Sequence, residues 1–251
     1  MTKNFMLTIS YDGTRYHGWQ SQKHTQGTIQ SKMENVLTRF LGEEIELNAS
    51  GRTDAGVHAF GQVANFHTNA EVTIEQLANA FYEYLPQDIV VTDIKEVQER
   101  FHARFSATGK CYQYRIWNSP QMDVFQRHYV WQIKDKLDVS AMRKAAQYFI
   151  GTHDFISFCS NKRMKKSSVR TIYDIQITEE SIAKGSEIKI AFYGNGFLYN
   201  MVRILTGTLV EVGYGKRDPE DMLNIIHDCN RQSAGMTAPP MGLMLMHVDY
   251  D

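Results

Sequence analysis

The sequence predicts an α+β fold made of two halves that share the element order β-α-β-β-α-β. Runs with alternating apolar residues, typical of strands, flank runs with apolar residues three and four positions apart, typical of helices. The same order recurs in residues 1–105 and 106–251, without a Pro-, Gly- or Ser-rich linker between them. Such halves are ferredoxin-like, a topology shared with RNA-recognition modules. We expect their antiparallel sheets to associate around a central active-site cleft.

The first half contains recognisable helix ends. Thr28 is a good N-cap for a helix that Gly42 ends, and Thr73 with Gln76 can form the capping box of a second helix. A short turn around Asp54 separates two strands between these helices. The four strands are expected at residues 5–10, 45–50, 60–67 and 89–97.

The second half repeats the order with different helices. A helix with one apolar stripe runs up to Gly151, and a long helix starts near Phe197 with its apolar residues facing the core. A shorter helix is expected to be capped by Asp218, with Pro219 at its first position. The four strands are expected at residues 110–117, 169–178, 187–193 and 243–248.

The composition excludes several classes of protein. Of the 251 residues, 43% are hydrophobic, which is enough for one large core or two modest ones. No apolar run approaches the roughly 18 residues of a membrane-spanning helix, and residues 1–20 lack the pattern of a signal peptide. Because no span is evident, we expect no membrane partner. The cysteines are single and widely spaced, which fits a protein of the reducing cytoplasm. The histidines are scattered, so we expect no bound metal. The cysteines are Cys111, Cys159 and Cys229.

One basic segment contrasts with a nearly neutral total charge. The chain has 27 basic and 28 acidic residues, so its net charge of −1 gives no general excess for binding RNA. Residues 161–170 nevertheless carry only positive charges. The segment is either a solvated surface loop or a loop that contacts phosphate groups. Its basic residues are Lys162, Arg163, Lys165, Lys166 and Arg170.

The turn at residues 51–59 has the sequence Gly-Arg-Thr-Asp-Ala-Gly-Val-His-Ala and holds one carboxylate between two glycines. Glycines allow a sharp, exposed bend where a substrate can approach the backbone closely. Arg52 stands two residues before Asp54, and a nearby positive charge favours an ionised carboxylate. Asp54 is therefore either a nucleophile held ionised or an Asx-type turn residue that bonds its own backbone. We expect His58 to be a core or turn histidine.

This turn resembles the signature of the tRNA pseudouridine synthases that modify the anticodon stem-loop. Further motifs follow in that family's order, so that the resemblance covers about residues 7 to 247. Before the turn they are Tyr11-Asp12-Gly13, Gly18-Trp19-Gln20 and Thr28-Ile29-Gln30. After the turn they are Leu85-Pro86-Gln87-Asp88-Ile89, Phe101–Ala107, Tyr112-Gln113-Tyr114, Gly151–Phe155, Phe197–Arg203 and Ala234–Leu243.

The resemblance implies a cofactor-free isomerase that converts uridine to pseudouridine at positions 38, 39 and 40 of tRNA. It also implies that the protein is a homodimer. It gives Asp54 the role of nucleophile, assisted by Arg52 and Arg203. Tyr112 would stack on the target uracil and take its C5 proton, whereas a tyrosine pair on a strand is ordinarily sheet packing. Helical spacing turns Arg203 away from the core. The alternative to its assisting Asp54 is therefore an ordinary solvent-exposed position.

Other basic residues are candidates for contact with the tRNA. Arg104 could instead pair with Asp12 or Asp88. Lys110-Cys111 stands where relatives often have two basic residues, so this chain has one basic residue fewer there for contact with phosphate. The candidates are Arg104, Lys110, Lys162, Arg163, Lys165 and Lys166.

Two other functions remain open from the sequence. A non-catalytic RNA-binding or RNA-chaperone protein could use the same fold, but it would not need a carboxylate beside phosphate. A glycosidase would use two acidic groups flanking the scissile bond, and only one motif carboxylate is evident.

The methionine-rich segment 236–246 packs in the core or contributes to the dimer interface, and we favour the core.

Overall fold

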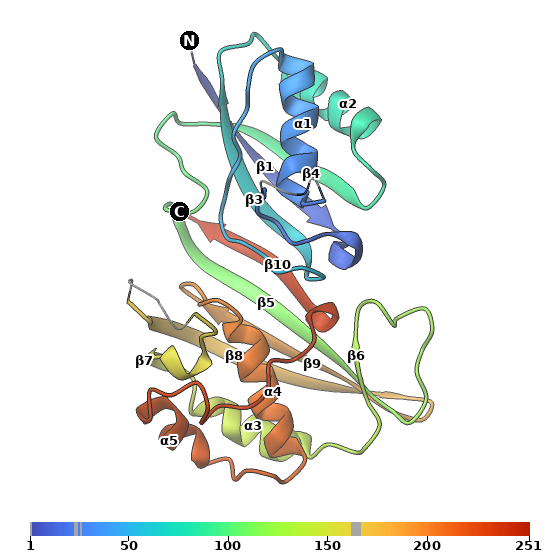
Figure 1. Ribbon diagram of the computed structural model, residues 1–251, viewed down its shortest axis with the longest axis vertical. Coiled ribbons are helices and arrows are strands. Elements are labelled where there is room, and N and C mark those ends of the chain that lie inside the picture. Colours follow the sequence, from blue (N-terminus) through green and yellow to red (C-terminus); the bar gives the residue numbers. More distant parts are fainter. Residues whose placement is uncertain (1, 23–24, 26, 162–166) are drawn as a thin grey trace. The chain divides into compact units, whose positions relative to one another are not determined.

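The structure is a computed structural model that describes residues 2–22, 25, 27–161 and 167–251. The chain has a mixed α+β fold, as predicted, and divides into two compact units. The first unit comprises residues 1–108 and 244–251, and the second comprises residues 109–243 (Figure 1). The expected division into folding halves at residues 105 and 106, and the association of their sheets, stay predictions. Within the described ranges, no helix is long and apolar enough to cross a membrane.

The first unit follows the predicted order β-α-β-β-α-β and adds one strand from the end of the chain. Its elements are β1 (Lys3–Tyr11), a 3-10 turn (Gly13–Arg15), α1 (Ile29–Leu41), β2 (Asn48–Ala49), β3 (His58–Thr68), α2 (Ile74–Tyr84), β4 (Ile89–Val97) and β10 (Leu243–Tyr250). In the sheet, β1 lies between β4 and β3 and is antiparallel to both, and β2 pairs antiparallel with β3. Helices α1 and α2 contact each other, and α2 packs against β4.

The helix ends of this unit are those that the sequence predicts. The Thr28 hydroxyl accepts a hydrogen bond from the third residue of α1, and Gly42 ends that helix with a left-handed backbone (φ 73°). At the start of α2, Thr73 and Gln76 form the expected capping box. These bonds satisfy N–H groups that a helix start leaves open, so both helices begin where the local capping chemistry dictates.

The strand expected at residues 45–50 is reduced to the two residues of β2. The reason lies in α1, whose side chains take the backbone hydrogen bonds that a neighbouring strand would form. Glu34 Oε1 accepts from the Leu47 N–H at 3.0 Å, and Gln30 Nε2 donates to the Leu47 carbonyl at 3.2 Å. The Leu47 side chain is buried all the same, so the hydrophobic pattern is satisfied without a full strand.

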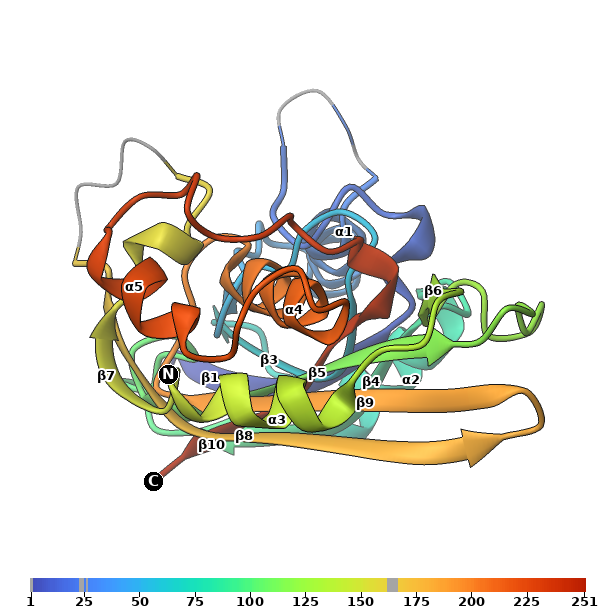
Figure 2. The ribbon, with the colours of Figure 1, turned by 90° about the horizontal axis from the view of Figure 1, so that it is seen from below.

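The second unit is a sheet covered by helices. Its elements are β5 (Ala107–Asn118), β6 (Trp131–Ile133), α3 (Val139–Gln147), β7 (Gly151–Asp154), β8 (Val169–Ile182), β9 (Gly185–Gly194), α4 (Met201–Gly213) and α5 (Asp221–His227), with 3-10 turns at Ile156–Phe158 and Pro240–Gly242. Strands β5, β9, β8 and β7 are neighbours in that order and antiparallel, and β6 runs parallel to β5. Helix α3 packs against α4 and β8, and α4 lies over one face of the sheet in Figure 2.

The last strand lies at the residues predicted for it, 243–248, and most of it is grouped with the first unit. Strand β10 pairs with the start of β3 and runs parallel to it. Gly61 of β3 makes room for this approach, because a Cβ there would lie 2.5 Å from the Met246 carbonyl oxygen. The pairing depends on a close contact between distant parts of the chain, which periodicity alone does not reveal.

Two helices of the second unit begin later than predicted. Helix α4 starts at Met201 and not near Phe197, because Asn200 before it adopts a left-handed conformation (φ 62°). Helix α5 starts at Asp221 and is not capped by Asp218. Asp218 does not cap the helix with its side chain; instead its backbone N–H donates to the Asp221 carboxylate at 3.0 Å.

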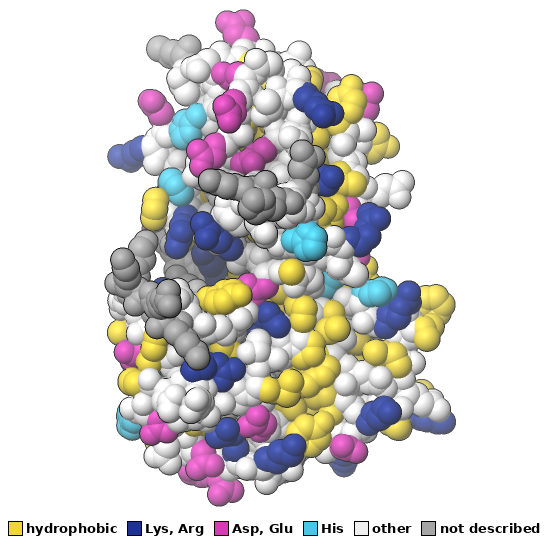
Figure 3. Space-filling view, in the orientation of Figure 1, with side chains coloured by type: hydrophobic (Ala, Val, Ile, Leu, Met, Phe, Trp, Pro, Cys, Tyr) yellow, Lys and Arg dark blue, Asp and Glu magenta, His cyan; other side chains and the backbone are white. Residues whose placement is uncertain are grey.

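Helix α4 is buried almost all round, although its sequence predicts one apolar face. Residues 234–242 cover it so closely that a Cβ at Gly207 would lie 1.9 Å from the Met236 carbonyl oxygen. The methionine side chains of the covering segment are not core residues, contrary to expectation. Met236 and Met241 are 50% and 36% exposed, and apolar side chains gather over this part of the second unit in Figure 3.

Candidate active site

Asp54 opens a tight turn in the first unit. The Val57 N–H donates to the Asp54 carbonyl at 3.1 Å, and Gly56 has a positive φ of 76°. These are the features of a type II turn, whose third position requires glycine or asparagine. The Asp54 side chain is partly exposed. The carboxylate is therefore held at a defined bend and remains within reach of a ligand.

Backbone contacts hold the turn from the N-terminal loop of the chain. The Trp19 N–H donates to the Thr53 carbonyl at 3.0 Å. Gly18 has a φ of 88°, and a Cβ there would lie 2.7 Å from the same carbonyl oxygen. A Cβ at Gly13 would lie 1.9 Å from the Val57 carbonyl oxygen. Two motif glycines thus let the N-terminal loop pack directly on the turn.

Buried hydroxyl and amide groups fix the residues on either side of the turn. Tyr11 Oη and Thr53 Oγ1 are 2.7 Å apart, and both side chains are buried. Burial raises the pKa of Tyr11, so its hydroxyl stays protonated at physiological pH. The Ser50 hydroxyl donates to Gln62 Oε1 at 2.7 Å, and the Gln62 amide donates to the Gly51 carbonyl at 2.9 Å.

His58 joins the end of the turn to another motif and is a core histidine, as expected. Its side chain is 1% exposed. Its Nδ1 lies 3.1 Å from the Gly13 amide nitrogen and 3.2 Å from Asp12 Oδ1. The first motif of the chain therefore contacts both the end of the turn and the strand that follows it.

The start of α1 supports the loop that packs on the turn. The Ile29 N–H donates to the Gly18 carbonyl at 3.2 Å, and the Gln30 N–H donates to the Trp19 carbonyl at 3.0 Å. Gln30 Oε1 also accepts from the Ser21 N–H at 2.9 Å. Three motifs that are separate in the sequence thus meet at the turn that carries Asp54.

Arg52 lies in the irregular segment that leads into the turn. Its side chain is exposed, so that solvent and salt screen its charge. The expected effect of Arg52 on the ionisation of Asp54 stays a prediction.

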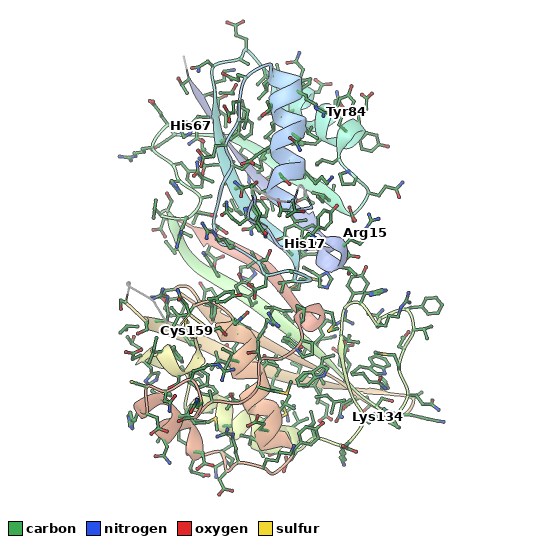
Figure 4. The ribbon with its side chains drawn as sticks, in the orientation of Figure 1. Arg15, His17, His67, Tyr84, Lys134 and Cys159 are labelled. Carbon is green, nitrogen blue, oxygen red and sulfur yellow. The ribbon has the colours of Figure 1, made fainter. Side chains whose placement is uncertain are left out.

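Arg104 is an exposed residue in a loop that is itself well anchored. The Ala103 N–H donates to Asn65 Oδ1 at 2.8 Å, and Tyr250 donates from its hydroxyl to the Ala103 carbonyl at 2.7 Å. Asp88, one of its two expected alternative partners, forms an ion pair with Arg15, which Figure 4 labels. The loop is therefore rigid at its base and presents a positive charge to solvent.

Tyr112 lies on the buried face of β5, as the alternation predicts. Tyr112 is 9% exposed and Tyr114 is fully buried, whereas Cys111 and Gln113 on the other face are half-buried. The ring of Tyr112 meets Phe197 edge-on, with 5.4 Å between the centroids. Sheet packing therefore accounts for Tyr114, and the stacking role of Tyr112 stays a prediction.

Arg203 is half-buried at the start of α4, so simple solvent exposure does not describe it. Its Nη1 donates to Asn200 Oδ1 at 3.0 Å, and its Nε donates to the Ala238 carbonyl at 2.7 Å. Burial raises the pKa of Tyr114, and the positive charge of Arg203 opposes that rise. The guanidinium is thus fixed within electrostatic reach of Tyr114.

The remaining candidates are basic residues of the second unit. Lys110 lies on β5 opposite Gly194 of β9 and is half-buried. Lys162, Arg163, Lys165 and Lys166 lie outside the described residues, and their contact with substrate stays a prediction. In the ranges that the structure describes, no three His, Cys, Asp or Glu side chains are placed to hold a metal ion. The first unit thus carries Arg52, Asp54 and Arg104, and the second carries Lys110, Tyr112 and Arg203.

The residues that brace these side chains are not evident as site residues in the sequence. Tyr11 and Thr53 support the turn, and Ala238 binds Arg203. All three stand inside motifs of the family resemblance, which is the only signal that the sequence offers for them. A residue that orients a distant side chain has no local sequence pattern, because only the fold determines which residue it contacts.

The whole chain is similar to known proteins. A sequence profile described as tRNA pseudouridine synthase matches residues 7–106 and 145–251. A tRNA pseudouridine synthase A of Acetivibrio thermocellus is 45% identical over 248 residues, which cover 99% of this chain and 100% of the relative. Two relatives come from a single strain of Bacillus cereus. Its tRNA pseudouridine synthase A 1 is 47% identical over 97% of both chains, and its tRNA pseudouridine synthase A 2 is 41% identical over 98% of this chain and 99% of the relative.

Proposed function

The chain belongs to the tRNA pseudouridine synthase family, and on this premise we propose that it isomerises uridine to pseudouridine in the anticodon stem-loop of tRNA, at positions 38, 39 and 40. The observation that carries the proposal is the match over residues 7–106, because it contains the Asp54 turn and the three motifs that brace it.

The reaction defines what the site must do. The bond between uracil N1 and the ribose breaks, the base turns, and a bond from C5 to the same ribose carbon forms. C5 loses a proton and N1 gains one, so electrons and atoms balance without an oxidant or reductant. The enzyme therefore needs a group that assists glycosidic cleavage, a cage that retains the free base, and an acceptor for the C5 proton.

Asp54 supplies the first of these groups as the nucleophile, which requires it ionised. The positive charges of Arg52 and Arg203 favour that form. Tyr112 stacks on the flipped uracil and accepts the C5 proton from it, a usual placement for an aromatic side chain in enzymes that act on bases. The support for Tyr112 is its position on the same buried face of β5 as Tyr114, whose hydroxyl senses the charge of Arg203.

The tRNA backbone is bound by basic side chains outside the catalytic turn. Arg104 and Lys110 contribute, together with the segment at residues 161–170. A symmetric homodimer in the cytoplasm would double this positive surface, which reconciles RNA binding with a net charge of −1. Sedimentation equilibrium at micromolar concentration checks the dimer, and a purely monomeric species there would contradict it.

We also infer that the two halves are ferredoxin-like. In the first unit, the antiparallel order β4-β1-β3-β2 and the contact between α1 and α2 support this topology. The second unit contributes the order β5-β9-β8.

The test of the function is the conversion of a tRNA transcript that carries uridine at positions 38 to 40. The transcript is incubated with enzyme, digested to nucleosides, and analysed for pseudouridine, whose mass equals that of uridine but whose retention differs. A matched transcript with cytidine at the three positions is the control. Pseudouridine in the first transcript alone is the expected result. Binding without conversion would support the RNA-chaperone alternative instead.

A further inference from the structure

Residues 234–242, which we call the strap, are locked against both α4 and β5 of the second unit. A Cβ at Gly207 of α4 would lie 1.9 Å from the Met236 carbonyl oxygen, and a Cβ at Gly242 would lie 2.6 Å from Cε1 of Tyr114. Thr208 Oγ1 accepts from the Gly235 N–H at 3.0 Å. The strap therefore has one available path over the helix.

Arg203 is bonded to the strap in both directions. Its Nε donates to the Ala238 carbonyl at 2.7 Å, and its own carbonyl accepts from the Ala238 N–H at 3.1 Å. Nη1 reaches Asn200 Oδ1 at 3.0 Å. The direction of the guanidinium thus depends on where one residue of the strap stands.

Two side chains fix the strap on either side of that residue. The Tyr114 hydroxyl donates to the Pro239 carbonyl at 2.7 Å. Arg231 donates from Nη1 to the Gly235 carbonyl at 2.9 Å and from Nη2 to Thr237 Oγ1 at 3.1 Å. Because burial raises the pKa of Tyr114, its hydroxyl remains a donor throughout the physiological pH range.

We propose that the strap is a positioning device for the reaction, in which Tyr114 and Arg231 hold Ala238 in place and thereby aim the Arg203 guanidinium. The inference rests on the proposed function, in which Arg203 acts on the catalytic carboxylate. Neither Tyr114 nor Arg231 needs to touch the tRNA for this role. A misplacement of a catalytic group by about 1 Å can cost on the order of a hundredfold in rate, so small shifts of the strap matter.

Tyr114→Phe is the first test, because it keeps the buried ring and removes only the bond to the strap. We expect kcat to fall about tenfold while KM for tRNA stays within about twofold, since geometry and not binding is disturbed. Arg231→Lys keeps the charge but loses the two-pronged geometry, and it should act in the same direction. It provides a second reading if Tyr114→Phe folds poorly.

The matched controls remove hydroxyls of the same unit that do not hold the strap. Ser186→Ala deletes a buried hydroxyl that donates to Glu179 Oε1 at 2.7 Å, and Tyr173→Phe changes a half-exposed tyrosine. Both should keep the wild-type kcat. A fall in kcat that follows the loss of thermal stability equally in Ser186→Ala and Tyr114→Phe would show a merely structural role and overturn the proposal.

A double-mutant cycle tests whether Tyr114 affects kcat through Arg203. In an Arg203→Lys background the bond to Ala238 is already altered, so adding Tyr114→Phe should lower kcat by less than about twofold. A full further tenfold loss would show that Tyr114 acts independently of Arg203, and the proposal would be wrong. If the wild-type protein made no pseudouridine, the proposed function would fall and this inference with it. An active wild type with an unaffected Tyr114→Phe would refute the strap alone.

Discussion

The Asp54 turn and the Arg203 region are both rigid, but they are held by different means. The turn is held mainly by main-chain contacts, with the Trp19 N–H bonded to the Thr53 carbonyl and Gly18 packed against the same oxygen. Arg203 is held by its own side chain, which bonds to Asn200 and Ala238.

The two means of support differ in what they tolerate. Backbone contacts leave no space for a Cβ, so the turn should resist conservative side-chain changes elsewhere but fail when a motif glycine is replaced. Side-chain contacts over a distance of 35 residues in the chain depend instead on each polar atom, so the Arg203 region should respond to single lost hydrogen bonds. Variants of the turn should therefore disturb its backbone conformation, whereas variants around Arg203 should disturb only the orientation of its side chain.

Gly18→Ala should have the largest effect of the variants that leave the reacting groups intact. The new Cβ would meet the Thr53 carbonyl at 2.7 Å, at a φ of 88° that alanine rarely adopts. We expect a loss of about 1–3 kcal/mol in the free energy of unfolding and on the order of a hundredfold in turnover. Chemical denaturation and steady-state kinetics measure the two.

Gly42→Ala is the matched control for this change. Gly42 also has a left-handed backbone, with a φ of 73°, but no atom stands within 4 Å of its Cβ position. It should cost about 1 kcal/mol of stability and leave turnover unchanged. Equal losses of turnover in both variants would mean that the contact of Gly18 with the turn has no special importance.

Tyr112 offers a test of chemistry against packing on β5. Tyr112→Phe should bind tRNA normally and lose turnover, because it keeps the ring but not the hydroxyl that accepts the C5 proton. Tyr112→Ala should in addition lose stacking, worth about 1–3 kcal/mol of binding. Filter binding and single-turnover rates separate the two effects. Equal defects in both variants would favour packing as the role of Tyr112.

The basic segment should affect binding and not chemistry. Replacing Lys162, Arg163, Lys165 and Lys166 with alanine should flatten the dependence of log K on log salt concentration by about 0.9 for each lost phosphate contact. The single-turnover rate at saturating tRNA should not change. Replacement of Lys134, Lys136, Lys184 and Lys216, which are exposed elsewhere in the second unit, is the charge-matched control. An unchanged salt dependence in the first variant would show an ordinary surface loop.

The sequence predicts the parts of this molecule that depend on local chemistry. The caps at Thr28 and Thr73, the glycine turn around Asp54 and the alternation on β5 are all found, because neighbouring residues suffice to determine them. The departures have distant causes. Residues 45–47 are not a strand because α1 side chains bind their backbone, and the pairing of β10 with β3 needs the space that Gly61 leaves. The bracing of Arg203 by Ala238 is hidden for the same reason.

The central claim is that the braced turn carries the chemistry through Asp54, and the single-turnover rate of Asp54→Asn tests it most directly. The amide keeps the shape of the carboxylate but cannot act as a nucleophile, and it leaves the Val57 bond to the turn unchanged. At saturating tRNA we predict no measurable pseudouridine, with tRNA affinity equal to that of the wild type or slightly higher, since one negative charge beside phosphate is removed. A folded Asp54→Asn protein that retained a tenth of the wild-type rate would contradict the claim.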